Sequence, residues 1–403
     1  MIVEHLSLVD FRNYAVADVT LGPGPNVFVG RNGQGKTNLA EAIAYLATLG
    51  SHRVSNDPPL VRDGADAAIV RARLTHGDRS VLLEAQLNRQ GANKARVNGA
   101  PVKTTELPRY AQVVLFAPED LQIVRGDPSL RRRFMDQLLV QRSPRFAGVI
   151  SDYDRVLRQR TALLKSAKVR GIRGEQLSTL DVWDDKLVAL GTELIQARLG
   201  LAADLSMPLI AAYSAIAGAD HRPQLDWALS VRGGDPEATS LSEAGVGGGA
   251  PDGSPAPDGN VGTRPTQIAE LFREALAERR AAELDRGLTL VGPHRDDLVL
   301  RVRDLPVKGY ASHGESWSVA LALRLASAEL LRADSRLGDP VLILDDVFAE
   351  LDTDRRARLA DLTVGYEQVI VTAAVEEDVP LGLRTRVVRV EAGRILEATD
   401  AGA

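Results

Sequence analysis

The sequence predicts an α/β fold in which both ends of the chain build one head and the middle adds a mainly helical arm. Near the start, an apolar strand leads through a glycine-rich loop into a helical pattern. Near the end, a second apolar strand closes on two carboxylates at 341–346. Between them, residues 129–232 carry apolar residues at helical spacing. We therefore expect a head from 1–120 and 288–403 and an inserted arm from 121–287.

The glycine-rich loop matches a phosphate-binding motif. Residues 28–37 read FVGRNGQGKT and fit the pattern G-x-x-x-x-G-K-[ST]. Glycine lets backbone N–H groups approach a triphosphate, and the helix that follows points its positive end at the anion. Lys36 would contact the β- and γ-phosphates, and the Thr37 hydroxyl would bind Mg²⁺. We expect the nucleotide to be held by Gly30, Arg31, Asn32, Gly33, Gln34, Gly35, Lys36, Thr37 and Asn38. The alternative is a glycine-rich turn that binds nothing.

A second motif lies at the end of the apolar strand near residue 341. Four apolar residues are followed by Asp345 and Asp346. A wholly apolar strand is typical of a buried parallel sheet, whose carboxyl edge is where such sheets bind ligands. We expect Asp345 to bind Mg²⁺ and Asp346 to be the base that orients or deprotonates the attacking water, with Lys36 completing the catalytic group. Taken alone, the two aspartates would also fit a helix-capping turn.

A third motif, Ser312-His-Gly-Glu-Ser, precedes the helical run 317–332. A hydroxyl and free backbone N–H groups at the start of a helix make an anion site. One protein needs only one such site for its own nucleotide. We therefore expect Ser312, Gly314 and Glu315 to meet the γ-phosphate of ATP bound in a second subunit. This arrangement predicts a homodimer that forms around ATP.

Positive charge is concentrated in one part of the chain. The net charge is −5, but residues 125–173 hold thirteen Lys or Arg against four Asp, which is +9 locally and leaves −14 elsewhere. A basic surface of this kind is expected of a protein that binds the phosphate backbone of DNA. The candidate DNA-binding residues are Arg131, Arg132, Arg133, Lys165 and Lys168. The alternative is that these side chains solvate helix faces or pair with acids elsewhere in the fold.

Short β patterns surround the phosphate loop. Residues 1–8 alternate as a strand, and the polar turn after them carries Arg12, which would lie over a purine base or simply on the surface. Two β-rich runs, 69–74 and 81–87, are followed by Asn98-Gly99, the dipeptide favoured in tight hairpins. These patterns predict an antiparallel β insert in the head.

The middle of the chain changes character twice. Residues 113–116 predict a buried strand, after which the pattern becomes helical. Residues 233–265 are dominated by Gly, Pro, Ser, Asp and Ala with almost no large apolar residues, so we expect a flexible loop. A last helix of the arm is expected at 266–286.

Bulk composition excludes several classes of protein. The 403 residues are enough for two or three domains. The chain has no cysteine, which excludes disulfides, zinc–thiolate sites and thiol catalysis and fits a reducing cytoplasm. The start has no basic segment leading into an apolar run, and nowhere do about eighteen apolar residues run together. We therefore expect a cytoplasmic, nucleoid-associated protein with no membrane partner.

The three motifs stand in one order with a large insert between them, and in this arrangement the chain resembles the ABC-type ATPase heads of the SMC-like proteins. The insert is too short and too irregular for a long coiled coil. Within that class, the chain resembles the ATPases of DNA gap repair over essentially its full length. The stretches that carry the resemblance are Phe11–Tyr14, Pro118–Leu121, Gly126–Asp136, Gly292–Leu298 and Leu344–Asp352.

The resemblance implies a protein that dimerises on ATP and binds double-stranded and gapped DNA, including junctions of single and double strands. It also implies slow, DNA-dependent ATP hydrolysis and cooperation with RecR and RecO in loading RecA at gaps. Two departures favour a slow switch over a fast motor. Thr372 stands where many ABC ATPases have a histidine that senses the γ-phosphate, and the glutamine loop falls between Gln112 and Gln122 without a glutamine of its own.

Two other functions are open on the sequence. The nucleotide-binding subunit of a transporter would present an uncharged coupling surface rather than a basic helical insert. An interaction protein whose ATP site only stabilises the fold would bind DNA equally well with and without nucleotide.

Overall fold

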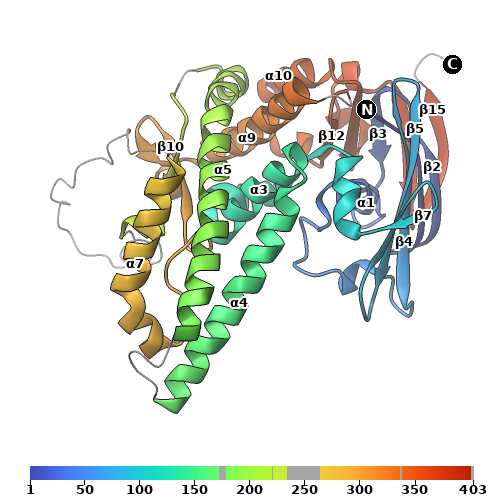
Figure 1. Cartoon of the computed structure of the whole chain (residues 1–403). Helices are drawn as coiled ribbons and strands as arrows, with labels where there is room; N and C mark the ends of the chain where they lie inside the picture. The colour runs from blue at the N-terminus through green and yellow to red at the C-terminus, as the bar shows by residue number, and fades with distance from the viewer. Residues whose placement is uncertain (172–177, 220, 234–263, 336–337, 401–403) are drawn as a thin grey trace.

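The computed structural model describes residues 1–171, 178–219, 221–233, 264–335 and 338–400. Figure 1 shows a sheet-rich head, to which both ends of the chain contribute, and an arm of long helices. The loop predicted at 233–265 lies almost entirely outside the described residues.

A six-stranded sheet in the head combines strands from both ends of the chain. Its order is β15-β14-β3-β13-β12-β8, and neighbouring strands are parallel except for the antiparallel pair β14 and β15. The bounds are β3 Gly24–Val29, β8 Val113–Phe116, β12 Val341–Asp345, β13 Gln368–Ala373, β14 Arg386–Glu391 and β15 Arg394–Asp400. Every residue of β12 is buried, as its apolar run predicts. The α/β class and the head built from both chain ends are confirmed.

A second sheet of six strands is wholly antiparallel and has the order β2-β1-β4-β5-β6-β7. Its strands are β1 Ile2–Phe11, β2 Tyr14–Thr20, β4 Ala67–His76, β5 Arg79–Asn88, β6 Lys94–Val97 and β7 Ala100–Val102. Asn98 and Gly99 have φ angles of 51° and 82°, the left-handed pair that a tight hairpin requires. The predicted antiparallel insert is confirmed.

Helix α1 (Lys36–Thr48) is buried between the two sheets of the head. One hydrophobic core contains Leu39 of α1, Leu74 of the antiparallel sheet and Ile343 of the central sheet. Because α1 is packed on both faces, the phosphate loop that leads into it is fixed relative to the strand ends of the central sheet.

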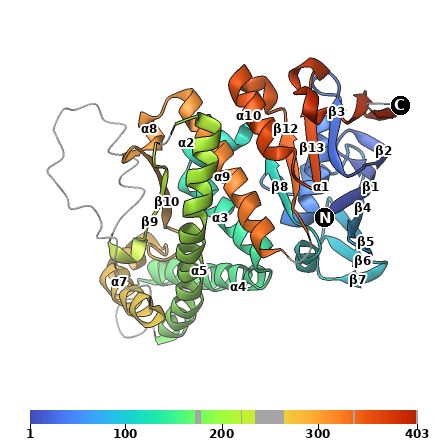
Figure 2. The same cartoon turned by 90° about the horizontal axis from the view of Figure 1, so that it is seen from above.

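The long helices in the described part of the arm are α3 (Pro128–Arg142), α4 (Phe146–Arg170), α5 (Ser178–Ala217) and α7 (Pro265–Arg286). Helices α4, α5 and α7 contact one another and extend away from the sheets (Figure 1). Figure 2 shows α9 (His313–Asp334) between α5 and the central sheet, and α9 contacts both α5 and β8. Helix α9, which begins at the Ser312 motif and is called the signature helix below, therefore links the arm to the head.

The shorter helices lie mainly at turns. They are α2 Leu121–Arg125, α8 Val307–Tyr310 and α10 Thr353–Thr363. The 3₁₀ turns are η1 Pro58–Leu60, η2 Thr104–Arg109, η3 Pro118–Asp120, η5 Ser230–Arg232, η6 Phe348–Glu350, η7 Glu376–Asp378 and η8 Leu381–Leu383.

A small sheet beside the arm contains a strand that the sequence did not predict. Its order is β11-β10-β9, with β9 Gln224–Ala228, β10 Asp297–Val302 and β11 Leu305–Pro306. Strand β9 falls within a stretch predicted as helical. It pairs antiparallel with β10, so strands from both sides of the predicted boundary at 287/288 share one sheet. The domain boundaries stay predictions.

Among the described helices, α5 is long and apolar enough to cross a bilayer by length and composition alone. Its most apolar window has a mean hydropathy of 1.5. In the fold, Leu194, Leu205 and Leu209 of α5 are buried in the main hydrophobic core, and the helix contacts α4, α7 and α9. Packing inside the protein therefore accounts for the apolar residues on the buried side of the helix.

Candidate nucleotide-binding site

The phosphate loop joins β3 to α1 and needs glycine at two positions. A Cβ on Gly30 would lie 2.2 Å from the Val390 carbonyl oxygen, and a Cβ on Gly35 would lie 2.6 Å from the Tyr14 hydroxyl. Gly35 also has a φ of 119°, which side chains rarely adopt. The neighbouring backbone, as well as a ligand, therefore requires glycine at these two positions.

Lys36 is buried at the start of α1, and its Nζ lies 3.4 Å from the Arg31 carbonyl oxygen. The loop is thus folded around its own lysine. Arg31, Asn32 and Gly33 are exposed at the top of the loop. An exposed glycine-containing loop at the start of a helix, with a lysine folded beneath it, suits a phosphate chain.

Three segments of chain meet at the carboxylate of Asp345. The Thr37 hydroxyl donates to Asp345 Oδ1 over 3.0 Å, and the Thr372 hydroxyl donates to the same oxygen over 2.5 Å. Asp345 and Thr372 are register partners in the parallel pair β12 and β13. The two motifs, separated by about three hundred residues, are therefore in direct contact.

Burial raises the pKa of Asp345 to about 6, and the negative charges of Asp346 and Glu119 add to the increase. Hydrogen bonds from Thr372 and Thr37 act in the opposite direction. A buried carboxylate beside a hydroxyl fits Mg²⁺, which prefers oxygen ligands and fills several of its coordination positions with water and phosphate oxygens. Within the described residues, no group of three or more His, Cys, Asp or Glu forms a separate metal cluster.

Asp346 is held in an unusual backbone conformation. Its φ is 51°, and its N–H donates to the Thr372 hydroxyl over 2.9 Å and to the Thr372 carbonyl oxygen over 3.2 Å. Thr372 is fully buried and its hydroxyl is engaged by both aspartates. The structure therefore places Thr372 as a residue that orients the acidic pair, rather than one extended toward a phosphate.

Arg12 lies beside the loop but is anchored by an acid that the sequence pattern did not reveal. Its Nε and NH2 donate to the buried carboxylate of Glu41 over 2.8 and 2.6 Å. Burial alone would raise the pKa of Glu41, but hydrogen bonds from Arg12 and Ser51 lower it below its usual value. Arg12 and Asn38 share an open depression next to the loop, where Asn38 donates to Asn13 over 2.7 Å. Asn13 in turn donates to the Gln34 carbonyl oxygen over 3.0 Å.

The Ser312 motif forms the start of α9. The Glu315 N–H donates to the Ser312 hydroxyl over 3.2 Å, and the Ser312 N–H donates to the Glu315 carboxylate over 3.0 Å, which is a capping box. Ser312 is exposed. A Cβ on Gly314 would lie 2.9 Å from the guanidinium of Arg355, and Glu315 pairs with Arg303 at 3.0 Å. The helix end is thus open to solvent and bordered by arginines.

The five candidate DNA-binding residues have different surroundings. Lys165 and Lys168 are exposed on α4. Arg132 and Arg133 are half-buried on α3 and donate to backbone oxygens, Arg132 to Asp296 and Arg133 to Ser51, each over 2.7 Å.

Arg131 requires a correction. It is only 4% exposed, and its guanidinium makes a bidentate pair with Asp297 at 2.7 and 2.9 Å. A further nitrogen donates to the Gly126 carbonyl oxygen over 2.9 Å. Arg131 therefore ties α3 to β10 and has no group free for DNA, so we do not carry it into the proposed interface.

Sequence reasoning missed His52, which lies in the loop after α1. Its Nε2 is 4.0 Å from Asp345 Oδ2 and its side chain is 11% exposed. Burial lowers the pKa of His52. The only signal in the sequence was the run Ser51-His52-Arg53 directly after the helix of the phosphate loop, in a chain that lacks a histidine after β13.

The fold and site define a class: an SMC-type ATPase head with a short inserted arm. The RecF/RecN/SMC N-terminal domain family matches residues 2–393. The solved Smc head domain from Pyrococcus furiosus shares the fold with a TM-score of 0.53 at 16% identity, over 99% of this chain and 96% of that chain.

More specific matches define the family within that class. DNA replication and repair protein RecF of Clavibacter sepedonicus is 58% identical over 99% of this chain and 95% of its own length. RecF of Leifsonia xyli is 57% identical over 98% of this chain and 100% of its own length. A solved structure of the recombination mediator protein RecF with ATP, in the RecFOR pathway, has a TM-score of 0.84 at 26% identity and covers 98% of this chain and 97% of that one. The chain belongs to the RecF family.

Proposed function

We propose that this protein is an ATP-dependent DNA-binding protein of replication and recombinational repair. The observation that carries the proposal is the contact of Thr37 with Asp345 at 3.0 Å, which assembles the phosphate loop and the acidic strand end into one site. ATP would lie along the loop from Gly30 to Asn38. Thr37 and Asp345 would hold Mg²⁺, which supplies charge neutralisation on the phosphates.

Asp346 is the candidate base for the attacking water, and its position is fixed by Thr372. Lys36 would stabilise the negative charge on the transferred phosphoryl group. Arg12, held by Glu41, would present its planar guanidinium to the purine base. We expect hydrolysis to be slow and dependent on DNA, as suits a switch.

Dimerisation would bring Ser312 of one subunit to the γ-phosphate held by the other. The capping box at the start of α9 supports this assignment, because Ser312 is exposed at the positive end of a 22-residue helix. Residues 349–352 would lie at the same dimer interface. In this arrangement ATP controls the closure of two heads on double-stranded or gapped DNA.

The arm supplies the candidate DNA contacts. Lys165 and Lys168 are exposed on α4, and Arg132 and Arg133 are partly exposed on α3. Protein partners would be RecR and RecO, with RecA loading at gaps as the outcome. The similarity to RecF proteins, one of them solved in the context of the RecFOR pathway, supports this part of the proposal.

Sedimentation with and without ATP tests the coupling of nucleotide to dimer. The wild-type chain should sediment as a dimer only with ATP, whereas Lys36→Arg and Ser312→Arg should both remain monomers. A dimer that forms without ATP would overturn the proposal. In parallel, binding to duplex, single-stranded and gapped DNA at one salt concentration should be stronger with ATP than without it.

A further inference from the structure

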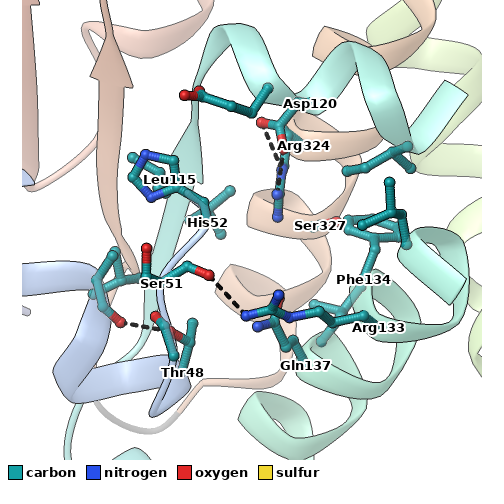
Figure 3. Close-up of a pocket in the computed structure, with 18 of the residues that line it drawn as sticks. Thr48, Ser51, His52, Leu115, Asp120, Arg133, Phe134, Gln137, Arg324 and Ser327 are labelled. Carbon is teal, nitrogen blue, oxygen red and sulfur yellow. Dashed lines mark hydrogen bonds and ion pairs between the residues drawn. The ribbon is translucent and has the colours of Figure 1, made fainter. Parts of the chain in front are cut away.

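A pocket of about 190 Å³ lies between the head and the arm, directly behind the nucleotide site. Its walls come from the loop after α1, from β8 and the turn that follows it, and from helices α3 and α9. Figure 3 shows Arg133 reaching from α3 to the Ser51 carbonyl oxygen, with His52 on the same loop. We refer to residues 50–53 as the post-helix loop.

His52 is the unusual residue of this loop. Its Nε2 is buried and has no hydrogen-bond partner in the described part of the chain. Leaving a buried polar group without a partner is costly, so its presence beside the carboxylate of Asp345 needs an explanation. Asp345 Oδ2 is 4.0 Å away, which is too long for a direct hydrogen bond and suits a contact made through water.

The two oxygens of Asp345 are used differently. Oδ1 accepts hydrogen bonds from Thr37 and Thr372, whereas Oδ2 faces His52. Without His52, the carboxylate would be oriented from one side only.

The post-helix loop is itself held from the arm. Arg133 donates to the Ser51 carbonyl oxygen over 2.7 Å, and a Cβ on Gly50 would lie 3.1 Å from the same guanidinium. On its other side, Ser51 donates through its hydroxyl to Glu41 and accepts from the N–H of Arg53 over 2.9 Å. The loop is therefore clamped between an arm helix and the helix of the phosphate loop.

We propose that His52 is a positioning residue for hydrolysis, which orients Asp345 through water, and that Arg133 keeps His52 in place by holding Ser51. This inference rests on the proposed function and deepens it, because it makes an arm arginine part of the support of the ATP site. His52 does not touch the nucleotide, so nucleotide affinity should not depend on it.

Steady-state hydrolysis of Mg²⁺-ATP in the presence of saturating duplex DNA tests the role of His52. His52→Leu keeps the volume but removes the hydrogen bond, and it should lower kcat at least about tenfold, since small misplacements at a reacting centre are costly. His52→Gln can place an amide near the Nε2 position and should recover kcat to within about threefold of the wild type. In both variants KM and the affinity for a fluorescent ATP analogue should stay within about threefold of the wild-type values. Equal activity of the Leu and Gln variants, or a loss explained by KM, would overturn the assignment.

A double-mutant comparison tests the link to Arg133. Arg133→Met should lower kcat, and His52→Leu with Arg133→Met should be no slower than His52→Leu alone, because both changes act on one carboxylate. Multiplicative losses would overturn the link. Arg142→Met is a matched control on the same helix, since Arg142 pairs with Asp204 and Asp334 and does not contact the post-helix loop.

The outcome is separable from that of the proposed function. If the wild type hydrolyses ATP and His52→Leu keeps its kcat, this inference fails while the proposed function stands. If the wild type hydrolyses ATP but forms no ATP-dependent dimer, the proposed function fails, and the comparison of His52 variants still decides the present inference.

Discussion

The Thr37 hydroxyl donates a hydrogen bond to Oδ1 of Asp345 over 3.0 Å, across 308 positions of sequence. The contact joins the first turn of α1 to the end of β12, two elements buried in the same head. Both atoms are oxygen ligands suited to Mg²⁺, so a metal ion entering this site would replace one hydrogen bond with two coordination bonds. Four predictions follow from this contact and from the surroundings of the arm residues.

Removing the Thr37 hydroxyl should weaken metal-dependent nucleotide binding. Thr37→Val removes one Mg²⁺ ligand at nearly constant volume, and we expect the gain in ATP affinity on adding Mg²⁺ to fall at least about tenfold, equivalent to about 1.4 kcal/mol. Thr37→Ser keeps the oxygen and should stay close to the wild type. Calorimetric titrations with and without Mg²⁺ measure the difference, and equal Mg²⁺ dependence in the Val and Ser variants would contradict the assignment.

The raised pKa of Asp345 predicts a pH-dependent stability. Because burial raises this pKa from 3.8 to about 6, the folded protein without metal favours the protonated acid, and stability is lost as the pH rises through about 6. Asp345→Asn cannot ionise and should therefore unfold less readily than the wild type at pH 7.5, by on the order of 1–3 kcal/mol. The advantage should disappear near pH 4. Melting temperatures across that range measure it, and a constant difference at all pH values would argue against the shift.

Arg131 and Asp297 should contribute to stability and not to DNA binding. Removing one partner of a buried ion pair typically costs about 3–5 kcal/mol, so Arg131→Met should destabilise the fold by that order. The double variant Arg131→Met with Asp297→Asn should lose less free energy of unfolding than the sum of the losses in the two single variants. Urea denaturation gives these values. A DNA-binding defect in folded Arg131→Met, at a temperature well below its melting point, would restore the original interpretation.

Lys165 and Lys168 should contribute to DNA binding and not to stability. Each exposed lysine that neutralises a phosphate adds about one to the slope of log affinity against log salt, so each alanine variant should lower that slope by about one. Arg79→Ala is a matched control, because it removes an exposed positive charge from strand β5 of the head. A salt titration in which all three variants behave alike would refute a specific role for α4.

The motifs were readable from the sequence because each is a local pattern tied to a strand end or a helix start; that they bind nucleotide stays a prediction. Thr37 and Asp345 meet because β3 and β12 belong to one sheet with its carboxyl edge at the loop. The helix start at Ser312 was likewise readable from a short run of residues, and the structure shows that its cap is a capping box with Glu315. Patterns of this kind carry their own geometry.

What the sequence could not supply were partners distant along the chain. Arg131 was grouped with its exposed neighbours because nothing local reveals Asp297, which is 166 residues away. Nothing in the local sequence around Glu41 indicates that its carboxylate pairs with Arg12. His52 belongs to no pattern, and only its buried nitrogen near Asp345 distinguishes it. Strand β9 was missed because its pairing with β10 decides its conformation more than its composition does.

Helix α5 has a mechanical consequence. Its 40 residues make it about 60 Å long at 1.5 Å per residue, and it packs against the signature helix α9 in the main core. The buried contacts of α5 in the core that it shares with α9 run from Leu194 to Ile216, so about 24 Å of helix, from Ser178 to Leu194, projects beyond them. A tilt of about 5° would carry the distant end through roughly 2 Å. A movement too small to alter the contacts of Ser312 would thus be amplified into a change of reach at the far end of the arm.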